Sequence, residues 1–308
     1  MQKISVVVRA LNEEEHLPRL ITGLKSQHVQ PDEMILVDSG STDQTVSLAE
    51  ASGFTIKRLA PEDFSFGRAL NLGFSTASGD IVVVLSAHVF PTHNNFLERL
   101  LEPFGNSEVA VSYGRQIGDS RTKFSEHQIL RGWFPEESAW DQGHPFCNNA
   151  NAAVRRSAWE FLKYDESLSG LEDLEFAKRA QQRGWGVSYV SEAAVVHVHE
   201  ETWSKVSTRY AREAAAYKRI YPSRTLGFLH LFYLFLKNTF HDFGQAQDER
   251  VLLKNVSSIV LFRMAQFVGT WKGFRISEPE SFELIQRFYY PPASKSPHAT
   301  PHEIATVP

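Results

Sequence analysis

Histidines that follow two apolar segments are the residues of this sequence best placed to bind a metal ion. His88 comes shortly after an apolar strand at residues 81–85, and His197 and His199 end a second strand-like segment at residues 194–199. Histidine is the commonest metal ligand, so these positions suit a divalent cation. We expect His197 and His199 to point to opposite faces of their strand, so that only one of them joins His88. Each histidine also fits an ordinary surface or core position, because no close ligand spacing marks a metal site.

Two adjacent carboxylates, Glu172 and Asp173, begin a predicted helix after Gly170. The free amide groups of a helix N-terminus favour negative charge, so a capping role is one explanation for this pair. Catalysis is the other, because a carboxylate held close to an acceptor hydroxyl takes its proton during a displacement reaction. The residues alone leave both explanations open.

Polar side chains also follow the second predicted strand and precede residue 152. The turn at residues 38–43 offers carboxylates and hydroxyls to a ribose and a base, or simply forms an Asx turn with a helix N-cap. The amides of Asn148, Asn149 and Asn151 both donate and accept hydrogen bonds, which suits a hydroxyl-rich ligand. Asparagine-rich loops are also common as plain turns.

Alternating strands and helices must position these groups. Four short apolar segments are separated by segments of helical pattern: residues 4–8, 33–37, 55–59 and 81–85. We expect Asn12 to be the N-cap of the first helix. The alternation predicts an α/β fold with a mostly parallel central sheet and right-handed crossovers. Ligands of such sheets bind outside the carboxyl ends of the strands, where His88 falls. No GxGxxG follows the first strand and no P-loop is present, which argues against NAD and FAD.

Two later regions do not follow this alternation. Residues 119–143 mix aromatic and charged side chains, which indicates a mobile or ligand-covering loop. After Glu201 the sequence is helical, and the segments at 226–243 and 251–271 carry aromatic and basic residues. Such helices are typical of a membrane interface and equally of helices that pack on a core. Residues 293–308 are rich in Pro, Ser, Thr and His and are predicted to be disordered.

Composition and charge exclude several classes of protein. The chain of 308 residues has a net charge of −4, which argues against nucleic acid as a partner. Its one cysteine excludes an internal disulfide and indicates a reducing compartment. We expect no signal peptide, because the first strand begins almost at once, and no transmembrane span, because polar residues interrupt the most apolar later segment.

Several motifs, taken together and in order, resemble the inverting family 2 glycosyltransferases. They are VVVRALNEEEHLPRLITGLKSQ, ILVDSGSTDQT, GRALNLGFSTASGDIVVVLSAH, CNNANAAVRRSAW, GLEDLEFAKRAQQRGW and the later HVH. The resemblance covers about residues 2–200 and is strongest to bacterial enzymes of surface polysaccharide synthesis, including rhamnosyltransferase-like members. It implies the GT-A fold, an α/β sheet that binds nucleotide-diphosphate sugars. We therefore expect a GT-A catalytic domain at residues 1–203, a C-terminal helical extension at 204–290 and a disordered tail at 291–308.

The resemblance also assigns roles by position. Asp173 takes the place of the catalytic base, with Glu172 beside it. Ser86 and His88 occupy the DxD motif, so both acids of that motif are replaced. Related transferases with a DxH motif use a further histidine, which implies a Mn²⁺ or Mg²⁺ site. The metal ligands would be His88 with His197 or His199. The donor-binding residues would be Ala10, Asn12, Asp38, Arg68, Asn71 and Ser86. The acceptor-binding residues would be Asn148, Asn149, Asn151 and Trp133.

These roles describe a one-step displacement with inversion, in which a base deprotonates the acceptor hydroxyl and the oxygen attacks the anomeric carbon opposite the leaving nucleotide. The expected acceptor is a glycan or polyprenyl-linked glycan at the cytoplasmic face of the membrane, with peripheral membrane contact. A catalytically silent nucleotide-sugar or glycan-binding protein with a degenerate DxD site is the alternative. A sugar-nucleotide pyrophosphorylase is disfavoured, because residues 8–11 are not a Gly- and Arg-rich loop. The donor sugar, its base and the oligomeric state are not specified by these residues.

Overall fold

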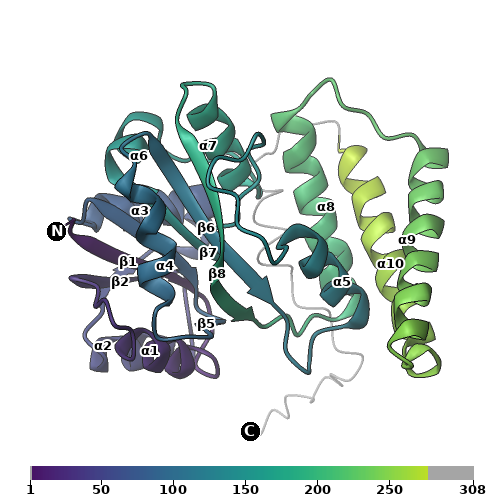
Figure 1. Ribbon diagram of the computed structural model, residues 1–308, viewed down its shortest axis with the longest axis horizontal. Coiled ribbons are helices and arrows are strands. Elements are labelled where there is room, and N and C mark those ends of the chain that lie inside the picture. The colour runs from purple at the N-terminus through teal and green to yellow at the C-terminus, as the bar shows by residue number, and fades with distance from the viewer. Residues whose placement is uncertain (1, 277–308) are drawn as a thin grey trace, which may run out of the picture.

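The computed structural model describes residues 2–276, in which eight strands form one sheet in the order β3-β2-β1-β4-β7-β6-β8-β5 (Figure 1). The strands are β1 Ile4–Ala10, β2 Glu33–Asp38, β3 Thr55–Arg58, β4 Ile81–Ser86, β5 Val89–Pro91, β6 Val109–Ile117, β7 Asn151–Arg155 and β8 Gly186–His197. Four of the pairings are parallel and three are antiparallel. The predicted α/β sheet is confirmed, as a mixed sheet in which β7 runs against both of its neighbours.

Helices cover both faces of this sheet. The α-helices are α1 Leu17–Lys25, α2 Thr45–Ala51, α3 Phe66–Thr76, α4 Phe96–Leu101, α5 Phe124–Trp133, α6 Arg156–Leu162, α7 Glu172–Gln181, α8 Trp203–Ile220, α9 Phe228–Asp248 and α10 Leu252–Phe274. Two short 3-10 helices are η1 Pro61–Asp63 and η2 Glu102–Gly105. The core explains the continuous apolar sequence of β4: Val82 packs with α3, α6 and α7, whereas the next residue, Val83, packs with α1, α2 and α4.

The first helix begins later than expected. α1 begins at Leu17 with His16 as its N-cap, so the expectation that Asn12 caps it is wrong. Asn12 instead has a left-handed backbone with φ of 55°, and its side-chain oxygen accepts a hydrogen bond from the backbone amide of Thr42 at 2.8 Å. A short amide side chain satisfies any backbone donor within reach, and here the loop after β2 lies closer than the start of α1. Asn12 therefore joins the loops that follow β1 and β2.

Residues 119–143 are more regular than expected. They contain α5, and Ala139 forms a β-bridge with Tyr189 of β8, so the expectation of an irregular loop is wrong for much of this region. Leu130 packs into the sheet core, whereas Phe124 packs against α9 and α10. Tertiary packing on two sides forms this helix, which explains why its own sequence pattern is weak.

The last three helices form a layer beside the sheet (Figure 1). α8 and α10 approach so closely that a Cβ atom added at Gly273 would collide with the backbone oxygen of Ala211. A buried ion pair joins α9 to α10, with Arg263 Nε 2.7 Å from Asp242 Oδ2. Within residues 2–276, every helix is too short or too polar to cross a bilayer. Residues 277–290 of the expected helical extension and the expected tail at 291–308 lie outside the described residues.

Candidate active site

Three histidine rings meet at one end of the sheet. His88 follows β4, His197 ends β8, and His199 lies two residues further on. The ring centroids of His88 and His197 are 5.1 Å apart, and those of His197 and His199 are 4.0 Å apart. One ring nitrogen from each lies within 4.8 Å of the other two. The expectation that only one of His197 and His199 joins His88 is wrong, because alternate residues of a strand share a face.

The Nδ1 atom of each ring lies at hydrogen-bond distance from a side-chain oxygen atom. The three pairs, each at 2.7 Å, are His88 with Glu13, His197 with Gln116, and His199 with Glu126. These oxygens only accept hydrogen bonds, so each Nδ1 carries the proton. In the neutral form of each ring, Nε2 then keeps its lone pair for a ligand.

Two of these Nε2 atoms face each other, since those of His197 and His199 are 2.9 Å apart. Two lone pairs at this distance repel unless a proton or a cation lies between them. Burial, together with the neighbouring His199 and His88, lowers the pKa of His197 well below its usual value. His197 is therefore neutral and offers its Nε2 lone pair, and the three ring nitrogens form a donor set that fits a metal cation.

Glu126 connects the histidines to the helical layer. Its Oε1 atom lies 2.7 Å from His199 Nδ1 and 2.7 Å from Arg209 Nη2 on α8. Burial raises the pKa of Glu126, but the hydrogen bond and charge of His199, followed by those of Arg209, outweigh it and hold the pKa at about 2. The Glu126 carboxylate is therefore ionised at neutral pH and fixes the orientation of the His199 ring.

The residues predicted to surround the donor lie at the carboxyl ends of β1, β2 and β4. Ala10 of β1 is in register with Asp38 of β2, and Arg9 of β1 is in register with Ser86 of β4. The buried Asp38 carboxylate accepts hydrogen bonds from the backbone amides of Gly40 and Ser41, both at 3.2 Å. Asp38 therefore forms the Asx turn that the sequence allowed as an alternative to ligand binding.

Arg68 and Asn71, also predicted to lie near the donor, bind the loop after α6. Arg68 Nε lies 3.0 Å from Glu166 Oε2. Asn71 accepts hydrogen bonds from Trp159 and the Tyr164 amide, and it donates to the Tyr164 carbonyl and to Glu166. Every donor and acceptor position of the Asn71 amide is thus used within the protein. This geometry favours a structural role for Asn71, which holds the loop against α3.

Glu172 and Asp173 are buried at the start of α7, and Asn149 binds both. The backbone amide of Asn149 donates to Asp173 Oδ2 at 3.0 Å, and its side chain donates to Glu172 Oε1 at 3.4 Å. Burial raises the pKa of Asp173, and the charge of Glu172 raises it further, to about 7. Arg9 lies 3.6 Å from Glu172 and opposes this increase. A carboxylate with a pKa near 7 suits a general base at neutral pH.

The acid pair and the histidines lie at the same end of the sheet. The backbone amide of Ser86 donates to the carbonyl oxygen of Ala150 at 3.2 Å, so the end of β4 lies beside the loop before β7. The neighbouring Asn149 holds Asp173, and His88 is two residues beyond Ser86. One backbone hydrogen bond therefore ties the segment that carries His88 to the segment that binds Asp173.

The residues predicted to contact the acceptor differ in accessibility. Asn148 is partly exposed, and Trp133 at the end of α5 is 48% exposed. Asn149 is buried against the acid pair, and Asn151 is fully buried in β7, where its side chain donates to the carbonyl of Ala193 at 2.9 Å. Asn148 and Trp133 are open to a ligand, whereas Asn149 and Asn151 position other groups.

Sequence reasoning missed five residues that complete this site: Arg9, Glu13, Gln116, Glu126 and Arg209. The first four each contact a candidate residue, and Arg209 contacts Glu126. The fold alone creates these contacts, and no spacing in the sequence links the partners. The one usable signal concerns Glu126, which stands four residues before the buried Leu130 and so shares its helix face. A carboxylate on the apolar face of a helix needs a partner, which here is Arg209.

A solved structure shows that the fold is that of a glycosyltransferase. The mannosyltransferase of Pyrobaculum calidifontis, in complex with GDP-Man and Mn²⁺, has a TM-score of 0.63 against this protein. The similarity covers 90% of this chain and 88% of that chain at 16% sequence identity. The mixed sheet with its flanking helices is thus the GT-A fold.

Similar sequences identify the family. The model of glycosyl transferase family 2 matches residues 5–162, and the protein belongs to this family. An O-antigen chain rhamnosyltransferase of Salmonella typhimurium is 28% identical over 221 residues, which cover 68% of this chain and 70% of that protein. Another, of Salmonella anatum, is 29% identical over 197 residues, covering 60% of this chain and 62% of that protein. The prediction of a family 2 glycosyltransferase is confirmed.

Proposed function

We propose that the protein transfers a hexosyl or deoxyhexosyl group from a nucleotide-diphosphate sugar to a hydroxyl of a glycan or polyprenyl-linked acceptor, in surface polysaccharide synthesis. The buried Asp173 carboxylate, with its pKa raised to about 7, carries this proposal. The Salmonella relatives are named as O-antigen chain rhamnosyltransferases, which supports a deoxyhexose donor. We place the reaction in the cytoplasm, at the inner face of the cell membrane, and the free buried Cys147 agrees with a reducing compartment.

In this proposal Asp173 is the general base. It takes the proton of the acceptor hydroxyl while the acceptor oxygen bonds to the anomeric carbon and the bond from that carbon to the diphosphate oxygen breaks. The nucleoside diphosphate leaves with the electron pair of the broken bond, and the configuration inverts. A positioned base of this kind contributes about 10²–10⁴-fold to the rate.

Glu172 and Arg9 would tune this base and not touch the reacting atoms. The charge of Glu172 raises the pKa of Asp173, and Arg9 opposes the increase from the other side of Glu172. Together with burial, which is the largest cause, these two charges leave Asp173 with a pKa of about 7, where a base is both sufficiently ionised and sufficiently strong at neutral pH.

We propose that the nucleotide lies against the joined loops at residues 10–12 and 38–42. The hydrogen bond from Thr42 to Asn12 and the Asx turn of Asp38 give these loops one fixed shape. The acceptor would approach from the side of Asn148 and Trp133, which are the accessible members of the predicted acceptor set.

The proposed metal ligands are His88, His197 and His199 together. The Nε2 atoms of His197 and His199 face each other. The hydrogen bonds at the three Nδ1 atoms leave the Nε2 atoms to bind a cation. Imidazole nitrogens suit Mn²⁺ better than Mg²⁺, which demands oxygen ligands. The GDP-Man complex of the Pyrobaculum enzyme also contains Mn²⁺. A cation here would supply positive charge to the leaving diphosphate.

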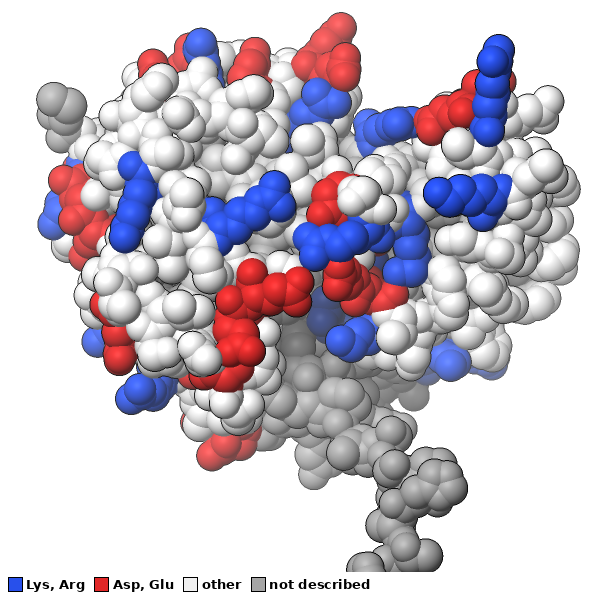
Figure 2. Space-filling model, turned by 90° about the horizontal axis from the view of Figure 1, so that it is seen from below, with Lys and Arg blue, Asp and Glu red and all other residues white. Residues whose placement is uncertain are grey.

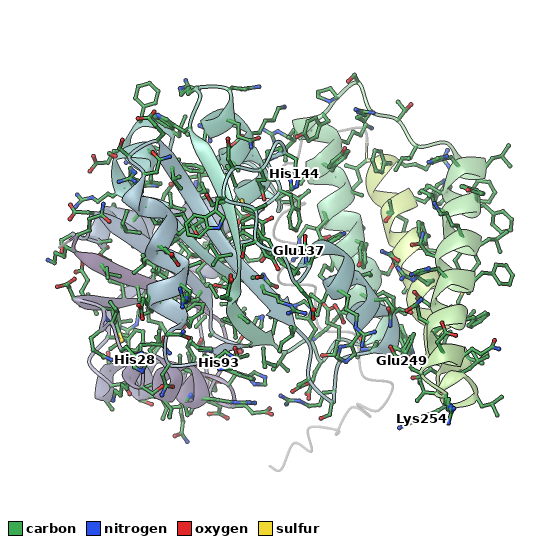
Figure 3. The ribbon with its side chains drawn as sticks, viewed as in Figure 1. His28, His93, Glu137, His144, Glu249 and Lys254 are labelled. Atoms are coloured by element: carbon green, nitrogen blue, oxygen red, sulfur yellow. The ribbon has the colours of Figure 1, made fainter. Side chains whose placement is uncertain are left out.

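The test is turnover of nucleotide sugars, measured as released nucleoside diphosphate. Asp173→Asn and His88→Ala are each expected to reduce turnover about 100-fold or more. His93→Ala is the matched control, because this exposed histidine lies five residues after His88 and outside the cluster (Figure 3). Undiminished turnover in both site variants would refute the site. Donor binding without any turnover by the unaltered protein would favour the silent binding protein instead.

A further inference from the structure

The helical layer carries an exposed apolar face on α9. Along this helix, large apolar side chains repeat every four residues with further ones beside them, and their exposure reaches 81% at Leu229 and 66% at Phe240. The exposed residues are Phe228, Leu229, Phe232, Tyr233, Leu236 and Phe240. A continuous row of this kind on one helix differs from the single apolar residues that are normal on a protein surface, and it marks an interaction site.

The neighbouring helix also carries exposed apolar residues. On α10, Leu253, Leu261, Met264 and Val268 are exposed, at spacings of eight, three and four residues that keep them on one side of the helix. We call the exposed apolar residues of α9 and α10 together the α9–α10 face. Its residues belong to the part of the chain that lies furthest from β1 and β2 (Figure 1).

The charge of this region is opposite to that of the chain. Residues 217–276 contain nine Lys and Arg and three Asp and Glu, although the whole chain has a net charge of −4. Two of the three acids are already paired, Asp242 with the buried Arg263 and Glu249 with Arg131 of α5. In Figure 2 most of the visible acidic residues lie over the sheet, and the charged residues that show at the helical end are mostly Lys and Arg.

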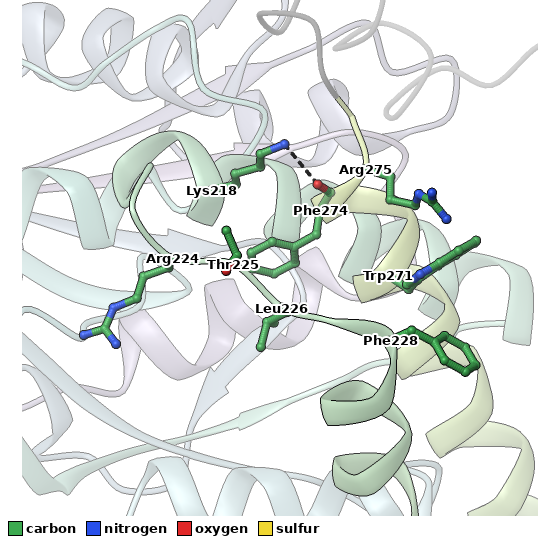
Figure 4. Close-up of a pocket in the computed structure, with 8 residues that line it drawn as sticks. All are labelled: Lys218, Arg224, Thr225, Leu226, Phe228, Trp271, Phe274 and Arg275. Atoms are coloured by element: carbon green, nitrogen blue, oxygen red, sulfur yellow. Dashed lines mark hydrogen bonds between the residues drawn. The ribbon is translucent and has the colours of Figure 1, made fainter.

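Aromatic and basic groups gather at one end of the face. A pocket of about 350 Å³ lies there between the start of α9 and the end of α10. In Figure 4, Phe228, Trp271 and Arg275 point to the same side of this pocket, and the Arg275 guanidinium lies 4.6 Å from the centre of the Trp271 ring. Amphipathic aromatic rings beside cationic side chains are the groups that settle at the boundary between lipid headgroups and acyl chains.

We propose that the α9–α10 face binds the surface of an anionic lipid bilayer. The apolar side chains of α9 enter the boundary between headgroups and acyl chains, and exposed cations such as Lys237 and Lys254 contact the anionic headgroups. A second copy of the chain is a poorer occupant, because two such faces would bring an excess of positive charge against itself. The charge excess therefore selects an anionic surface as the partner.

Vesicle binding by the full chain tests this inference, using vesicles of phosphatidylcholine alone and vesicles that also contain phosphatidylglycerol. Sedimentation with the anionic vesicles is expected to be at least about tenfold stronger and to weaken with added salt. Phe232→Ser with Phe240→Ser is expected to abolish it. Phe161→Ser is the matched control, because Phe161 on α6 is 66% exposed, as Phe240 is, and lies outside the face. Reversal of one charge, as in Lys237→Glu, is expected to weaken binding about fivefold.

Each other outcome overturns the inference. Equal binding to both vesicle types, or no binding by the full chain, excludes an anionic bilayer as the partner, and retained binding by the double variant excludes this face. A dimer that the double variant converts to monomer, without vesicle binding, identifies the face as a subunit contact. Melting temperatures and release of nucleoside diphosphate in solution are measured on the same variants. Unchanged values separate loss of membrane binding from loss of folding or of the proposed transfer.

Discussion

The backbone amide of Asn149 donates a hydrogen bond to the carboxylate of Asp173 at 3.0 Å. The candidate base is thus held by main chain, and the segment that holds it pairs with the end of β4 through Ser86 and Ala150. A contact made by the backbone does not depend on the side chain at position 149. The geometry of Asp173 is therefore fixed by the sheet.

The activity is expected to depend on the ionisation of Asp173. Because burial and the charge of Glu172 raise the pKa of this carboxyl to about 7, the basic form is scarce in acid and increases as the pH rises through about 7. Initial rates with saturating donor should rise through this range and level off above it. Asp173→Asn should be about 10²–10⁴-fold slower and should lose this rise. A rate that is constant from about pH 5 to pH 8 would exclude Asp173 as the base.

Arg9→Met is expected to move this pH dependence upwards. Arg9 lowers the pKa of Asp173, so removal of its charge should raise the midpoint of the rate profile by about one pH unit or less. The rate at low pH should fall, and the plateau at high pH should change much less. Arg58→Met is the control, since this exposed arginine ends β3. An unshifted midpoint in Arg9→Met would show that Arg9 does not tune the base.

Mn²⁺ is expected to stabilise the protein through the three histidines. A ligand at about 100 times its dissociation constant stabilises the native state by about 2.7 kcal/mol, which corresponds to roughly 4 °C in melting temperature for a chain of 308 residues. His197→Ala should remove this shift, and His93→Ala should keep it. Differential scanning fluorimetry with Mn²⁺ and with a chelator measures both. Equal shifts in the unaltered protein and in His197→Ala would place the ion elsewhere.

Two glycines of the helical layer are expected to respond in opposite ways to alanine. A Cβ at Gly273 would collide with Ala211, so Gly273→Ala should destabilise the protein by about 3 kcal/mol. At Gly244 on α9 no atom lies within 4 Å of an added Cβ, and Gly244→Ala should stabilise by about 0.5–1 kcal/mol through helix propensity. Urea unfolding followed by circular dichroism compares them. If both variants unfold at the same urea concentration, the contact between α8 and α10 is looser than described.

Most strands of the sheet were predictable, because a strand that is buried on both faces has a continuous apolar sequence, but β5 was not predicted. The apolar run of β4 and the alternation of β1 and β2 with helices needed no knowledge of distant residues. The sequence of α5 has no such pattern, because Phe124 and Leu130 pack against different partners and do not form one apolar stripe. Without this periodicity, the sequence predicted a loop where the structure has a helix.

The site was predictable only in part, because contacts between residues far apart in the sequence leave no local pattern. The resemblance assigned His88 and Asp173 to neighbouring functions, and the structure brings their segments to the same end of the sheet. The prediction that only one of His197 and His199 joins His88 is wrong, because these two histidines share a face and both lie beside His88. Glu126 and Arg209 lie 83 residues apart and become partners through packing alone.

The bond between Arg209 and Glu126 has a consequence for engineering this enzyme. Arg209 belongs to α8, outside the segment matched by the family model, yet its charge fixes the acid that orients His199. Hybrids that exchange the C-terminal helices between related transferases would separate these two side chains. A working chimera must carry α5 and α8 from the same parent.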